Sequence, residues 1–159
     1  MTKPSGDPFQ DMCTMIGVMT ISWAWCENGL AIAIAVIDAN RLDGVSGRTS
    51  LPISLSKKLD YLKTALREIP ALEGVEKDGT LLVQMFSDLK HRRHSIIHGS
   101  LWSGRAGSFE NLNIKSKGRL VAPDQQPIDI ADVIRLNIEI KRLSDVGMTF
   151  LRKINVIYP

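Results

Sequence analysis

Cysteine is scarce in this sequence, which contains only Cys13 and Cys26. Both lie in one apolar stretch, and the helix expected between them would separate them by about 20 Å, which is too far for a disulfide. We therefore expect two buried thiols. The first eight residues include two prolines and a glycine and lack the apolar segment of a signal peptide, so we expect a cytoplasmic protein.

An excess of charge of one sign is also missing, because 20 Lys and Arg stand against 17 Asp and Glu. The net charge of +3 is too small for a protein that coats nucleic acid. A content of 44% hydrophobic and 23% charged residues, without repeats, excludes disordered and fibrous chains. The length of 159 residues suits one core, so we expect residues 1–10 to be a flexible N-terminal arm and residues 11–159 to form a single helical domain.

No uncharged apolar run is long enough to span a bilayer. Residues 12–37 are mostly apolar, but Glu27 divides them into uncharged runs of 15 and 10 residues, the second of which begins with the polar Asn28. A membrane span needs roughly 20 residues, so we expect no membrane association. Instead, the density of apolar residues predicts a core helix from Asp11 to about Asn40 that is buried on most sides.

Apolar residues at spacings of three and four predict three further helices. The second begins after Ser54 and ends at Pro70, the third ends at Gly99, and the last begins at Asp129 and runs almost to the C-terminus. Their lengths and connections predict an all-α fold, a bundle of four to five helices.

The helical period is lost between the third and the last long helix, over residues 100–127. Residues 109–114 and 119–121 alternate loosely between apolar and polar around Lys117 and Gly118. This pattern predicts a short β-hairpin insert that turns at Lys117–Gly118.

All three histidines of the chain, His91, His94 and His98, lie within eight residues of the third predicted helix. Residues 85–122 contain seven Lys and Arg against two acidic residues, whereas the rest of the chain has 13 basic and 15 acidic residues. This local excess predicts a basic patch that could bind phosphate. An ordinary solvated charged face is the alternative.

The histidines allow three interpretations. His94 and His98 have the spacing of a metal-binding pair, but the adjacent Arg92 and Arg93 would repel a divalent cation, so we expect no metal site. Histidines without any chemistry on a half-buried helix are the second possibility. The third interpretation pairs Arg93 with His98.

Residues 93–99 read RHSIIHG and resemble the R-x4-6-H motif of the HEPN superfamily. A polar residue commonly follows the arginine in that motif, and His94 stands there. The motif ends the third helix of the predicted bundle, after a long apolar first helix and before the insert, so the resemblance covers about residues 11–155. It implies a HEPN-like bundle that forms a homodimer and, in active members, is a metal-independent endoribonuclease without a cofactor.

The family also includes toxins and defence elements, so the resemblance implies a possible cognate antitoxin. In toxins that are controlled by nucleotidyltransferase antitoxins, a tyrosine commonly follows the motif histidine by two residues. This chain has Ser100 at that position. Other HEPN-like domains are non-catalytic dimerisation modules or bind RNA or nucleotides, and such a module is the alternative function.

Metal-independent RNA cleavage needs an acid and a base at the ribose-phosphate linkage and a cation over the phosphorane. Imidazole titrates near neutral pH, and guanidinium holds two phosphate oxygens. We therefore expect His98 to be the acid or base and Arg93 to hold the phosphorane, with 2′,3′-cyclic phosphate and 5′-hydroxyl ends as products.

Arg93 and His98 are five residues apart, which places them 140° apart around an ideal helix. They can meet only if the helix frays before Gly99 or if a twofold interface brings two copies of the motif together. The family resemblance favours the twofold interface.

Four further residues are candidates for weaker roles. Arg92, His94 and Trp102 are candidates for substrate binding, and a buried Glu27 would support the site by pairing with Arg92 or Arg93. Alternatively, Arg92 is simply solvated, Trp102 belongs to the core and Glu27 faces water.

Overall fold

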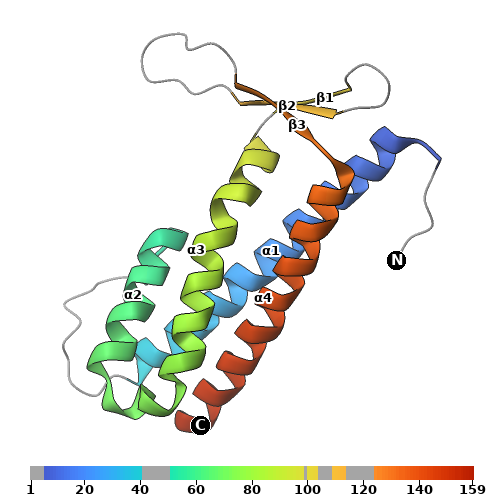
Figure 1. Cartoon of the computed structure of the whole chain (residues 1–159). Helices are drawn as coiled ribbons and strands as arrows, with labels where there is room; N and C mark the ends of the chain where they lie inside the picture. The colour runs from blue at the N-terminus through green and yellow to red at the C-terminus, as the bar shows by residue number, and fades with distance from the viewer. Residues whose placement is uncertain (1–5, 41–50, 99, 104–108, 114–123) are drawn as a thin grey trace. The chain divides into compact units, whose positions relative to one another are not determined.

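Four helices packed as a bundle make up most of the chain in the computed structural model (Figure 1). The prediction of a helical bundle is therefore confirmed. The structure describes residues 6–40, 51–98, 100–103, 109–113 and 124–159.

The helices follow the predicted order along the chain. Ser54 caps the second helix by accepting a hydrogen bond from the backbone N–H of Lys57, at 3.4 Å. Pro70 then starts a short 3-10 helix, because it lacks the N–H that would continue the preceding helix. The first helix begins three residues before the expected start. The bounds are α1 Pro8–Ala39, α2 Leu55–Glu68, η1 Pro70–Val75, α3 Glu76–His98 and α4 Ile130–Ile157.

The chain divides into two compact units, and α1, α3 and α4 each contribute to both. Unit 1 consists of Met1–Ser22 and Asp88–Ile140. Unit 2 consists of Trp23–Ser87 and Lys141–Pro159.

Unit 2 contains α2, η1 and segments of the other three helices. Its core includes Trp23 of α1, whose ring meets the edge of Phe86 of α3 at a centroid distance of 5.4 Å. Buried Tyr61 donates a hydrogen bond of 3.0 Å to Asp38 and so ties α2 to α1. This bond therefore links the end of α1 to the core-facing side of α2.

Unit 1 combines segments of α1, α3 and α4 with a three-stranded antiparallel sheet. The strand order is β1-β2-β3. Met12 of α1, Phe109 of β2 and Val133 of α4 form its buried core. The sheet is therefore anchored to the helices through the first residue of its central strand. The bounds of the strands are β1 Ser100–Ser103, β2 Phe109–Asn113 and β3 Asp124–Ile128.

The hairpin predicted around Lys117–Gly118 is not confirmed. Phe109–Asn113 is extended, as expected, but it pairs with Ser100–Ser103 on one side and with Asp124–Ile128 on the other. Residues 114–123, which include the expected turn and the expected second strand, lie outside the described residues. The alternation of apolar and polar residues predicted β2 but not β1 and β3, because short polar strands show no such alternation.

The expectation that α1 is buried on most sides is wrong. One face of α1 is buried, but large apolar side chains on another face are exposed, with 63% of Ile21 and 71% of Trp25 accessible. Cys13 is also exposed, so only Cys26 is the buried thiol that we predicted. The exposed apolar residues of α1 from its second turn onward are Val18, Ile21, Trp25 and Ile32.

By length and composition alone, α1 could cross a membrane, a test that core helices also pass. A third (33%) of its most apolar stretch is buried within the chain. The absence of a membrane partner stays a prediction.

We predict that Gly79→Ala destabilises unit 2. A Cβ atom at Gly79 would lie 2.6 Å from Cδ1 of Leu66 and 3.1 Å from Cε2 of Phe150, and both side chains are buried. After the gain in helix propensity, the free energy of unfolding should fall by roughly 1 kcal/mol in urea denaturation. Gly17→Ala is the control, since its Cβ meets nothing within 4 Å, and it should raise that free energy by about 0.5–1 kcal/mol. Equal stability of the Gly79→Ala variant and the wild type would contradict the predicted clash.

Candidate functional site

Arg93 takes a core position in the apolar stripe of α3. The buried side chains of Leu82, Phe86 and Leu89 recur at spacings of four and three, and the next position at that spacing is Arg93. Accordingly, Arg93 is half-buried and its Nε atom is buried. A charged group on the core side of a helix is uncommon, which makes this arginine the strongest candidate for a functional residue. The stripe is visible in the sequence, and extending it by one step would have found this position.

The last turns of α3 are held in place by the core of unit 1. Ile96, three residues after Arg93, packs against the cluster of Met12, Phe109 and Val133. The helix ends at His98, and β1 begins two residues later at Ser100. The motif therefore lies at a junction of helix and sheet that shares one core, which limits the movement of its backbone.

Arg92 forms an ion pair with Glu139 of α4. Its Nη1 atom lies 2.5 Å from Oε2 of the carboxylate, and the two side chains are 47% and 36% exposed. At that exposure an ion pair contributes about 0–1 kcal/mol to stability. Arg92 was expected to contact RNA, and in this structure its guanidinium instead binds a carboxylate of the chain itself.

A second ion pair lies one helical turn away on the same side of α4. Asp132 pairs with Arg135, which holds the pKa of Asp132 below its usual value, mainly through the hydrogen bond. The same hydrogen bond raises the pKa of Arg135, and the charge of Glu139 adds to this rise. Charged residues of alternating sign, Asp132, Arg135 and Glu139, therefore line this side of α4, and the last of them pairs with Arg92.

The predicted basic patch is partly neutralised by Glu139 of α4, which pairs with Arg92. Of its seven cations, Lys90, Arg92 and Arg93 lie in α3, whereas the other four fall within residues 104–108 and 114–123, outside the described residues. Sequence reasoning missed Glu139, because a local charge count cannot include a partner that is 47 residues away.

The histidines do not form a cluster with a described geometry. His91 and His94 are exposed, and His98 is the last residue of α3, with a side chain outside the described ones. The helix is unbroken through His98, so the Cα atoms of Arg93 and His98 lie about 140° apart around its axis. The fraying that would bring the two residues to one face of one chain is therefore absent from the backbone.

The remaining two candidates, Trp102 and Glu27, lie elsewhere. Trp102 lies in β1, opposite Glu110 in the register, and its side chain is outside the described ones. Glu27 is half-buried and accepts a hydrogen bond of 2.5 Å from the indole Nε1 of Trp23, one turn earlier in α1. Arg92 pairs with Glu139 in this structure, and the expected pairing of Glu27 with Arg92 or Arg93 stays a prediction. The spacing of four residues between Trp23 and Glu27 in a predicted helix was the sequence signal for this hydrogen bond.

Among the described residues, no group of three or more His, Cys, Asp or Glu side chains could hold a metal ion. The side chain of His98 does not belong to these described residues.

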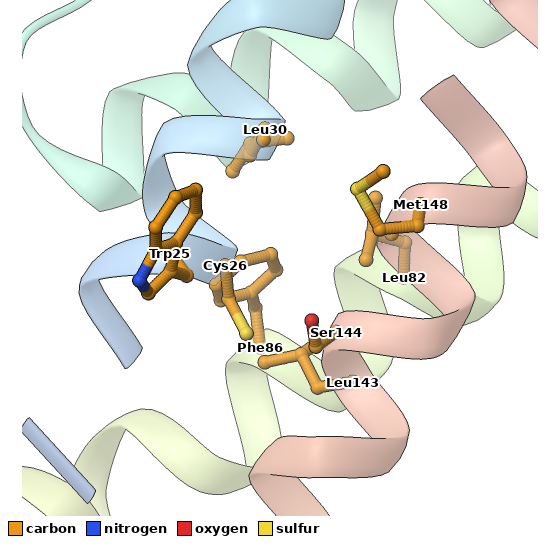
Figure 2. A pocket seen from close by; sticks show the side chains of 10 residues that line it. Trp25, Cys26, Leu30, Leu82, Phe86, Leu143, Ser144 and Met148 are labelled. Carbon is orange, nitrogen blue, oxygen red and sulfur yellow. The ribbon is translucent and has the colours of Figure 1, made fainter. Parts of the chain in front are cut away.

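Unit 2 contains an apolar groove lined by residues of α1, α3 and α4. It encloses about 260 Å³, including space that is open to solvent. Figure 2 shows the sulfur of Cys26 and the hydroxyl of Ser144 facing the space between their helices. Burial raises the pKa of the Cys26 thiol to about 11, although a hydrogen bond with Ser144 opposes the rise. The thiol is therefore neutral near pH 7 and is a poor nucleophile.

We predict that Cys26 resists alkylation. In a Cys13→Ser variant, which leaves Cys26 as the only cysteine, iodoacetamide at pH 8 should react about 100-fold more slowly with the folded protein than with the protein in urea, because the pKa of Cys26 lies about two units above the ordinary 9.0. The Cys26→Ser variant is the control, and its exposed Cys13 should react rapidly in both conditions. Similar rates for folded and unfolded Cys26 would contradict the prediction.

Comparison with known proteins yields no relative: no protein-family model, no curated protein and no solved structure matches this chain. The family resemblance of residues 93–99 stays a prediction.

Proposed function

We propose that the chain is a metal-independent endoribonuclease of the HEPN type. Arg93 holds the phosphorane, and His98 transfers the proton of the attacking 2′-hydroxyl or of the leaving 5′-oxygen. Cleavage leaves a 2′,3′-cyclic phosphate and a 5′-hydroxyl. Neither a metal ion nor a cofactor takes part in this reaction.

The burial of Arg93 on the core side of α3 is the observation that carries the proposal. A guanidinium whose Nε atom is buried keeps fewer side-chain conformations than one in solvent. It therefore loses less conformational entropy when it binds a phosphate. Packing of Ile96 in the core of unit 1 holds the same helix end, which further favours a preorganised site.

We further propose that the active form is a homodimer. Because α3 is unbroken, Arg93 and His98 of one copy lie on different sides of its helix. A twofold axis beside the helix end would bring Arg93 of one copy toward His98 of the other. In this arrangement His94 and Trp102 contact the RNA on either side of the cleaved bond, and Glu27 acts only on the fold of α1. A cognate antitoxin, if the protein is a toxin, would cover the same surface in the cytoplasm.

RNA cleavage tests the catalytic proposal. Purified protein in EDTA should cut mixed RNA, and His98→Ala and Arg93→Met should each slow cleavage by at least about 100-fold. Methionine keeps a long apolar stem at the core position of Arg93, which protects the fold. End analysis of the products should show cyclic phosphate.

His91→Ala and Arg142→Ala are matched controls, since both replace exposed residues outside the motif, and they should cut at the wild-type rate. Equal loss in controls and motif variants would show that the cleavage is not due to the motif. RNA that stays intact with the wild type contradicts a nuclease.

A non-catalytic dimerisation or RNA-binding module is the second candidate. The exposed apolar face of α1 favours it, since exposed tryptophan and isoleucine commonly mark surfaces that bind other proteins. Salt-dependent binding of RNA without cleavage would support this candidate over the first.

Sedimentation tests the dimer that both candidates require. At micromolar concentration the mass should be about twice 17.6 kDa. Ile21→Asp should weaken the dimer by roughly 30-fold or more, because it places a charge among the exposed apolar residues of α1 in unit 1, the unit that also holds the end of α3. Leu81→Asp, at an exposed apolar residue of α3, is the control and should leave the dimer intact. A mass of 17.6 kDa for the wild type would contradict dimerisation.

A further inference from the structure

The ion pair between Arg92 and Glu139 lies directly beside the position of Arg93. Arg92 belongs to α3 and Glu139 to α4, and both residues are part of unit 1. The N–H groups of a guanidinium bind carboxylates and phosphodiesters with the same planar geometry. Glu139 and an RNA phosphate are therefore competitors for Arg92.

We propose that Glu139 is an autoinhibitory residue that RNA must displace from Arg92. This inference rests on the proposed function and adds a regulatory step to that site. While the ion pair is closed, the guanidinium of Arg92 is held by Glu139 and does not bind the phosphate. Once it opens, Arg92 binds the neighbouring phosphate, so that two adjacent arginines hold the RNA.

The exchange is feasible because both side chains of the pair reach solvent. Exposures of 47% and 36% allow a phosphate to approach Arg92 while Glu139 is still bound. A polyanion such as RNA brings several phosphates to the same place, which favours replacement of a single carboxylate.

Arg135 offers Glu139 a second partner within α4. The two residues are four positions apart on that helix, a spacing that allows their side chains to interact. Glu139 already contributes to the raised pKa of Arg135, behind the larger effect of Asp132. A released Glu139 therefore keeps a cation within reach, which lowers the cost of opening the pair with Arg92.

Binding of uncleavable RNA tests the inference. A short fluorescent 2′-O-methyl oligouridylate lacks the attacking hydroxyl, so its anisotropy reports binding alone. Glu139→Gln should tighten binding by about three- to tenfold, because RNA no longer has to displace a carboxylate from Arg92. It should leave the dependence of log K on log salt unchanged, because Arg92 contacts the phosphate in both proteins. Thermal melting of each variant checks that the fold is intact.

Glu68→Gln is the matched control. Glu68 forms an ion pair of 3.0 Å with Arg67 in α2, so this variant removes the same charge from a similar exposed pair in unit 2. It should change affinity by less than Glu139→Gln and leave the salt slope at the wild-type value. An equal gain in RNA affinity in both variants would show that the gain comes from the change in net charge alone, and it would overturn the proposal.

The double variant Arg92→Gln/Glu139→Gln identifies the residue through which Glu139 acts. Arg92→Gln alone should have a small effect, whereas in the Glu139→Gln background it should remove the whole gain. A gain that survives in the double variant overturns the proposal.

Two further outcomes separate this inference from the proposed function. If the wild type cuts RNA but Glu139→Gln binds no more tightly, the autoinhibitory role is wrong and the nuclease stands. If neither the wild type nor Glu139→Gln binds or cuts RNA at low salt, both are wrong.

Discussion

The interaction on which the candidate site depends is the partial burial of a cation in the apolar stripe of α3. Arg93 stands where the spacing of Leu82, Phe86 and Leu89 calls for an apolar side chain, and its Nε atom is buried. Such a position lowers the mobility of the guanidinium at a cost in solvation. Departures from an apolar core pattern are expected at functional sites, which makes Arg93 the centre of the candidate site.

The surroundings of this arginine come from segments far apart in the sequence. Ile96 anchors the helix end to a core that includes Phe109 of the sheet and Val133 of α4, and α4 also supplies Glu139, the partner of Arg92. One side of α3 is thus held by apolar packing, while an adjacent side carries an exposed ion pair. Two adjacent arginines therefore differ in their surroundings: Arg93 is held by packing, whereas Arg92 can exchange its carboxylate partner for another anion.

Helical periodicity was sufficient to predict the four helices, because each apolar stripe repeats over several turns. It failed for α1, since a helix with two apolar faces has the same composition whether one face or both are buried. It also failed for the sheet, because Ser100–Ser103 and Asp124–Ile128 are too short and polar for an alternating pattern. Arg93 and His98 were found as a motif, but the inward position of Arg93 and the carboxylate at Arg92 depend on tertiary structure.

Because α1 has two apolar faces, either face could pack against the core during folding. A rotation about its own axis would turn Ile21, Trp25 and Ile32 inward in place of the observed core side chains. Asn28 lies on that outer face between Trp25 and Ile32, and it is exposed. Turned inward, its amide would lose water without a designed partner, at about 1–3 kcal/mol. Asn28, together with Thr14, which is exposed on the same face, thus disfavours the alternative orientation of the longest helix in the chain.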